Sequence, residues 1–188
     1  MNSWFLRGAL GLIVVLGAVL VLVIMLAPGG EREVQIGDRT ITSQRATVVD
    51  RAEENTGNVV VQPSPEFLIE YAFGDGLDGF NILIIQADGS GEYTYWDKAS
   101  DSTRQKKLTF EVSPEQLEAI CSQLNQSGFM ALANEYRGND ANGTQIAITV
   151  VSGHVEKEVY CDNHFPMAVV TLADYLEKEV IQPQRKSS

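Results

Sequence analysis

The sequence predicts an α+β fold: an antiparallel sheet of about six strands, in the order ββββαββα, with two helices on one face, preceded by a single transmembrane helix. Three observations lead to this prediction. Residues 8–27 form one apolar run, six later segments have strand patterns, and two segments carry an apolar stripe at helical spacing. Strands joined by short turns are antiparallel, and amphipathic helices cover one face of such a sheet.

The run from residue 8 to 27 has no charged, amide or hydroxyl side chain, and thirteen of its twenty residues are Leu, Ile or Val. A helix of that length spans about 30 Å, the thickness of the hydrocarbon core of a bilayer. The alternative is a cleaved signal peptide, whose apolar stretch is about 7–15 residues long and ends at a small-x-small site. The residues before Pro28 make a poor cleavage site. We therefore expect a single-pass membrane protein with a short tail over 1–7.

The orientation of this segment depends on the charges beside it and on the length of the domain after it. Arg32, Arg39 and Arg45 lie after the segment and, counted strictly, favour a cytoplasmic C-terminal side. However, a short N-terminal tail usually stays inside, and a long domain translocates largely regardless of its charge. We expect an extracytoplasmic C-terminal domain, joined to the membrane segment by a flexible linker over 28–64 that lacks sustained periodicity.

The domain over 65–183 is acidic, and a short tail over 184–188 follows it. Residues 65–188 hold 19 acidic and 9 basic side chains, a net charge of −10, within a chain whose net charge is −11. Such a domain repels phosphates, so nucleic acid is not an expected partner. The one basic cluster, at Arg104, Lys106 and Lys107, offers no base-stacking side chain and is expected to be a solvated strand face.

Four strands open the domain. Residues 67–73 alternate with period 2, 80–86 are apolar on both faces as in a central strand, and 92–97 return after the Asp88-Gly89 turn. A fourth alternating strand covers 107–112. Ser113-Pro114-Glu115-Gln116 then predicts a helix start with a capping box, because Ser caps the helix and Gln lies three residues later.

The second half of the domain repeats strand and helix signals. The first helix carries its apolar stripe on Leu117, Ile120, Cys121 and Leu124, and the Phe129 segment that comes next is expected to plug the edge of the core. Strands over 144–151 and 154–161 form a hairpin around Ser152-Gly153. A last helix over about 166–181 has its apolar face on Val169, Leu172, Ala173, Leu176 and Val180.

These turn, cap and plug motifs resemble those of an uncharacterised bacterial family of domains of unknown function. The likeness lies in Asp88-Gly89, in the stretch from Val112 to Leu117, and in Ser127-Gly128-Phe129 followed by Tyr136, and it extends over about residues 67–181. Met130 stands where the family usually has a second aromatic residue. The resemblance implies a secreted or membrane-attached domain and implies no activity.

Cys121 and Cys161 are both expected to face the interface between sheet and helices. In an oxidising compartment they would form a disulfide that closes a loop of about forty residues, contributing up to about 4 kcal/mol to stability. The alternative is a pair of buried thiols that behave as ordinary apolar residues. The sequence leaves both alternatives open.

No catalytic constellation is evident, so the sequence does not predict an enzyme. Cys161 and His164 would supply two of the four ligands of a structural zinc site, and Cys121 could add a third. A fourth ligand is missing, because His154 lies on a separate turn. The loop over 74–79 has acidic residues at a spacing of three and no closing glutamate, which is typical of a turn rather than a calcium loop. No cofactor is expected.

The sequence therefore favours a non-enzymatic binding module of the cell envelope, with an unidentified protein or envelope component as partner. The first alternative is a metal- or thiol-dependent enzyme or sensor that uses Cys121, Cys161 and His164. The second is an accessory subunit of a membrane complex, although the segment over 8–27 has no GxxxG motif and no polar residue to drive helix association.

Overall fold

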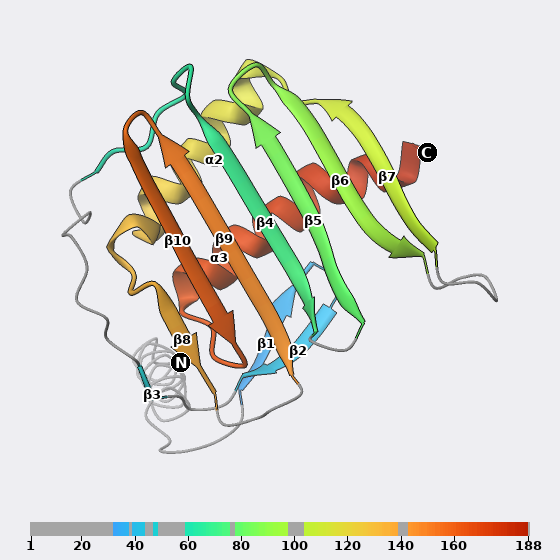
Figure 1. Cartoon of the computed structure of the whole chain (residues 1–188), viewed down its shortest axis with the longest axis vertical. Coiled ribbons are helices and arrows are strands. Elements are labelled where there is room, and N and C mark those ends of the chain that lie inside the picture. Colours follow the sequence, from blue (N-terminus) through green and yellow to red (C-terminus); the bar gives the residue numbers. More distant parts are fainter. Residues whose placement is uncertain are drawn as a thin grey trace, which may run out of the picture. The chain divides into compact units, whose positions relative to one another are not determined.

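A computed structural model describes residues 32–37, 39–43, 47–48, 59–75, 78–97, 104–138 and 143–187 (Figure 1). The chain divides into two compact units, Met1–Gly30 and Glu31–Ser188, and every described residue lies in the second. The apolar segment over 8–27 is outside the described residues. Within the described ranges no helix is long and apolar enough to span a bilayer. The transmembrane helix of the predicted fold is therefore not part of the described structure.

The second unit is built on one eight-stranded sheet with the order β3-β8-β10-β9-β4-β5-β6-β7. All neighbouring strands are antiparallel except β8 and β10, which are parallel. The strands are β3 (Thr47–Val48), β4 (Leu68–Asp75), β5 (Gly79–Gln86), β6 (Ser90–Asp97), β7 (Arg104–Glu111), β8 (Glu135–Arg137), β9 (Thr144–Ser152) and β10 (Val155–Asp162).

The predicted antiparallel sheet of about six strands is therefore wrong in both number and pairing. The two additional strands, β3 and β8, have only two and three residues. An alternating pattern needs at least four residues to be recognised, so strands of this length leave no signal in the sequence. β8 joins the edge of β10 through three residue pairs, from Tyr160↔Glu135 to Asp162↔Arg137. That edge makes the sheet mixed.

The helices α2 (Pro114–Ser127) and α3 (Met167–Tyr175) lie on one face of this sheet, behind the strands in Figure 1. The predicted capping box is present, since Gln116 N–H donates to the Ser113 hydroxyl and the Gln116 side chain accepts from Ser113 N–H. Gly128, with φ of 72°, ends α2 in the left-handed conformation that glycine adopts without strain. A 3₁₀ turn, η1 (Phe129–Ala131), follows.

The hydrophobic core fills the space between the sheet and these helices. Both predicted helix stripes are buried there, together with every second residue of the central strands. The central strands contribute Ile69, Tyr71, Phe73, Leu83, Ile85, Ile146, Ile148, Val150, Val159 and Cys161 to it. The opposite face of the sheet carries the alternate residues, and no described helix covers it (Figure 1).

Within the segment over 28–64, where the sequence predicts a flexible linker, the described residues include secondary structure. A hairpin, β1 (Arg32–Ile36) and β2 (Arg39–Ser43), turns at Gly37, which has a φ of 61°. Ile36 is fully buried, and β1 lies against α3. The stretch before β4 is also bound, because Val61 exchanges two 2.9 Å hydrogen bonds with the Asn125 side chain on α2.

Candidate functional site

One face of the sheet is left uncovered by the described helices (Figure 1). Here it is called the open face. The alternating burial along each strand and the strand registers place on it Leu68, Glu70, Ala72, Phe80, Ile82, Ile84, Glu92, Thr94, Trp96, Ala147, Thr149, Val151, Glu156, Glu158 and Tyr160, and, at its two edges, Gln105, Lys107, Glu135, Arg137 and Asp162.

The middle of the open face is apolar. Strand register aligns Tyr160, Ala147, Ala72 and Ile82 across four neighbouring strands, and these four residues are called the apolar row. Trp96 on β6 flanks the row on the open face. The stacked side chains of Tyr93 and Tyr95, on the same strand, lie on the opposite face, toward the helices. A partly exposed tryptophan beside aliphatic side chains is a common composition of protein-binding surfaces.

A line of carboxylates lies beside the apolar row, two residues further along the strands. Glu158, Glu70 and Glu92 lie in one line across the sheet, each two strands from the next, and these three are called the carboxylate row. Glu92 forms an ion pair of 2.7 Å with Lys107. Glu70, Glu156 and Glu158 form no hydrogen bond or ion pair among the described residues. The open face therefore carries carboxylates around an apolar centre, with cations at its two ends: Lys107 on β7, and Arg137 on β8, whose guanidinium lies 5.8 Å from the centre of the Tyr160 ring.

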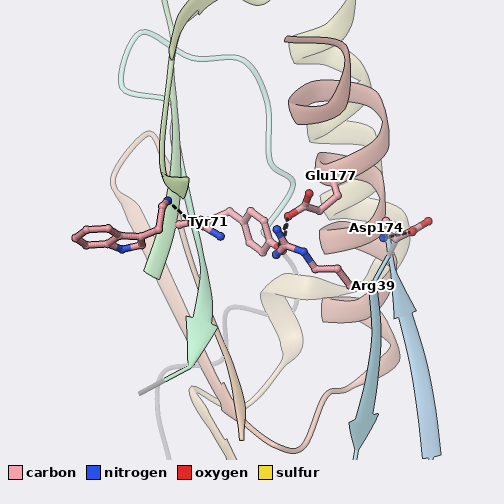
Figure 2. Close-up of polar contacts among 7 residues, drawn as sticks. Arg39, Tyr71, Asp174 and Glu177 are labelled. Atoms are coloured by element: carbon pink, nitrogen blue, oxygen red, sulfur yellow. Dashed lines mark hydrogen bonds and ion pairs between the residues drawn. The ribbon is translucent and has the colours of Figure 1, made fainter. Parts of the chain in front are cut away.

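A second feature is a cluster of polar side chains between the sheet and the C-terminal helical segment. It is called the buried polar cluster and consists of Arg39, Tyr71, Asp174 and Glu177 (Figure 2), together with Tyr93. Tyr71, Tyr93 and Glu177 are buried, whereas the Arg39 and Asp174 side chains at its edge are half-buried. The Tyr71 hydroxyl donates to Glu177 Oε1 at 3.4 Å, and Arg39 Nη1 lies 3.9 Å from the same oxygen. The Arg39 guanidinium also lies 4.5 Å from the centre of the Phe73 ring, a cation–π contact.

Local backbone geometry brings this cluster together. After Tyr175 the helix widens into a π-helical segment, η2 (Leu176–Ile181), before α4 (Gln182–Ser187). The Gly37 turn of the hairpin lies directly on this segment: Gly37 N–H donates to Asp174 Oδ1 at 2.9 Å, and a Cβ on Gly37 would meet Glu177 Cβ at 3.1 Å. The hairpin is thus fastened to the helix through Asp174 and Glu177.

The tyrosines of the buried polar cluster are held neutral. Burial, and secondly the Glu177 charge, raises the pKa of Tyr71 well above its ordinary value. The same causes raise the pKa of Tyr93 to about 12 against the opposing charge of Arg39. The Tyr93 hydroxyl is buried and forms no hydrogen bond of ordinary geometry with a described residue. Neutral, enclosed phenols of this kind hold a structure together rather than transfer protons near pH 7.

Sequence patterns did not predict this cluster. Its one signal is Glu177 itself, which lies four residues after Ala173 and three before Val180, inside the apolar stripe of the last helix. An acid in such a stripe needs a buried partner. The partner, Tyr71, is more than a hundred residues away in the chain and lies on an apolar strand face.

The predicted thiol residues are both buried, and the structure has them as free cysteines. Cys121 lies on the core side of α2 and Cys161 on the core side of β10. Burial raises the pKa of Cys161 to about 12, and burial together with the charge of Glu118 raises the pKa of Cys121 to about 11. A thiol with so high a pKa is a poor nucleophile at neutral pH. A bond between the two sulfurs remains a prediction.

We expect both thiols of residues 31–188 to react slowly with a maleimide at pH 8 and rapidly once the chain is unfolded. With pKa values near 11 and 12, roughly one thiol in a thousand or fewer is ionised at pH 8, whereas an unfolded cysteine has a pKa of about 8.5. Mass spectrometry counts the labels. Two labels after unfolding without reductant indicate free thiols, and none would reveal the disulfide instead.

The predicted metal-site residues do not form a donor set. His164 stacks on Tyr136, with ring centres 5.8 Å apart, and His154 is exposed on the turn before β10. Within the described ranges no three His, Cys, Asp or Glu residues are grouped as a metal site would require. In the loop over 74–79, residues 76 and 77 are outside the described residues, and Asp78 N–H donates to the Asp75 carboxylate three residues before it.

The basic run on β7 is neutralised locally. Lys106 forms an ion pair with Asp97, and Lys107 pairs with Glu92 on the neighbouring strand. Arg104 is exposed at the start of the strand. Because charged edge strands resist pairing with other chains, these residues are consistent with protection of the sheet edge.

Comparison with known proteins does not add to this picture: no protein-family model and no curated protein matches the chain. The resemblance to an uncharacterised bacterial family therefore stays a prediction from the sequence motifs.

Proposed function

We propose that the domain over 59–187 is a non-enzymatic binding module of the cell envelope that recognises another protein through its open face. The observation that carries this proposal is the apolar row, whose four residues are half-buried and which no described helix covers. An apolar surface of a sheet is stabilised when a partner removes it from water, by about 25 cal/mol for each Å² buried. Membrane attachment through residues 8–27 rests on the hydropathy of that segment alone.

An enzyme or sensor that uses Cys121, Cys161 and His164 has weaker support. Both thiols are buried and hard to ionise, and His164 packs against an aromatic ring. The buried polar cluster is engaged in fastening the hairpin to the helix. The role of accessory subunit in a membrane complex is compatible with the proposal, since such a subunit also needs a binding face.

Site-specific photo-crosslinking tests the proposed surface. We expect the full chain, with Ile82 replaced by benzoylphenylalanine and irradiated in its own host cells, to form a discrete adduct of higher mass. The matched control carries the same replacement at Met167, which is 72% exposed on the helix side. An adduct from position 82 and none from position 167 supports the open face. No adduct from position 82, or equal adducts from both positions, contradicts the proposal.

A further inference from the structure

We infer that the open face binds a basic amphipathic helix of its partner; this inference rests on the proposed function. The surface has two properties that a partner must match. One is the apolar row of Tyr160, Ala147, Ala72 and Ile82, and the other is the carboxylate row of Glu158, Glu70 and Glu92 beside it. An apolar stripe flanked by cations on one segment satisfies both.

The spacing of the carboxylate row fits a helix that crosses the strands. Neighbouring strands are about 4.8 Å apart, so carboxylates on alternate strands are about 10 Å apart. Cations seven residues apart on a helix are separated by about 10.5 Å, because each residue rises 1.5 Å. Lysine or arginine at every seventh position would therefore meet Glu158 and Glu70 in turn, and a third would reach Glu92, which is already paired with Lys107.

The apolar row is in position to take the hydrophobic stripe of the same helix. It lies two residues along each strand from the carboxylate row, which is about 7 Å. Ala147 and Ala72 at its centre have short side chains and let a helix approach the sheet closely, while Ile82 and Tyr160 stand on either side. An amphipathic helix places its apolar and cationic side chains on adjacent faces at a similar separation.

The charges of this surface favour a cationic partner over an acidic one. Of its carboxylates, Glu70, Glu156 and Glu158 form no ion pair with a described residue. The cations of the same face are already engaged, Lys107 with Glu92 and Arg137 with Glu135. Glu156 extends the acidic border along β10, two residues from Glu158. An acidic segment placed here would meet like charges in a surface that is partly removed from water, and like charges in such contacts disfavour the wrong partner.

The test uses residues 31–188, which form a compact unit with a hydrophobic core of their own. Trp96 is the only tryptophan in this fragment and flanks the apolar row, so its fluorescence reports binding at the open face. The probe is an 18-residue amphipathic helix of leucine and lysine, and its counterpart has every lysine replaced by glutamate. We expect the lysine peptide to change the Trp96 emission saturably and the glutamate peptide to leave it unchanged.

A matched pair of charge reversals separates a site from general attraction between opposite charges. E156K/E158K reverses two exposed carboxylates of the open face, and E118K/E179K makes the same change in net charge on the helix side. We expect the first variant to bind the lysine peptide about tenfold more weakly and the second to bind within about twofold of the parent, because only the first meets the peptide directly.

Equal weakening in both variants, or binding of the glutamate peptide as tight as that of the lysine peptide, would overturn the inference. Its failure is distinguishable from failure of the proposed function. If position 82 still crosslinks to a protein in cells, the open face binds a partner of another chemistry. If neither experiment gives a signal at the open face, the proposed function is lost as well.

Discussion

Replacing Phe129 by alanine is expected to lower the free energy of unfolding of residues 31–188 by about 4 kcal/mol. Phe129 follows the glycine cap of α2, and its ring is 0% exposed in the core between helix and sheet. Truncation removes the transfer free energy of the ring and leaves a cavity that the surrounding strands can only partly close. Urea unfolding followed by circular dichroism measures the change.

The control for Phe129 is Met167→Ala. Met167 begins α3 and is largely exposed, so its truncation is expected to change the free energy of unfolding by no more than about 0.5 kcal/mol. If Phe129→Ala were no more destabilising than this control, the 3₁₀ turn after α2 would not seal the core as the structure has it. Both variants share one parent, so errors of extrapolation largely cancel.

Phe129 also illustrates which features local sequence predicts well. Ser113 and Gln116 fix the start of α2, and Gly128 fixes its end, so the residue after the cap has little freedom in where it points. The stripe on Leu117 and Leu124 then decides which side of the helix is buried. These features depend on interactions within a few residues, and such interactions leave patterns in the sequence.

The features that sequence did not predict depend on contacts between distant segments. The two-residue strand β3 pairs with β8, which is far from it in the chain, and β8 in turn joins β10 rather than β9, the strand that follows it in sequence. The hairpin over 32–43 has no apolar pattern, but it is held because Gly37 reaches Asp174 and Ile36 enters the core. A short segment of this kind gains order from tertiary contacts rather than from its own propensity.

The open face escaped prediction from the sequence for a different reason. Residues 80–86 are apolar at alternate positions on both faces, with Ile82 and Ile84 against Leu83 and Ile85. Such a pattern indicates a strand covered on both sides. In the described structure the helices cover only the side of Leu83 and Ile85. The apolar residues on the other side of β5 are therefore the ones that the proposed partner would bury.

The second large effect is expected at the buried polar cluster. Glu177→Ala should lower the free energy of unfolding by about 2–3 kcal/mol, because the substitution leaves the buried Tyr71 hydroxyl without its acceptor and Arg39 without its carboxylate. Glu177 is only 5% exposed, so water cannot easily replace the lost contacts. The control is Glu179→Ala on the exposed side of the same helical turn, for which the expected change is below about 0.5 kcal/mol.

Glu177→Gln separates the hydrogen bond from the charge. Glutamine keeps an oxygen that can accept from the Tyr71 hydroxyl, but it has no charge and cannot form an ion pair with the Arg39 guanidinium. A loss well below that of Glu177→Ala would assign most of the stabilisation to the hydrogen bond and to packing against Gly37. An equal loss would assign it to the ion pair. If Glu177→Ala and Glu179→Ala unfold at the same urea concentration, the hairpin is not fastened through Glu177, and the buried polar cluster has no structural role of the kind described.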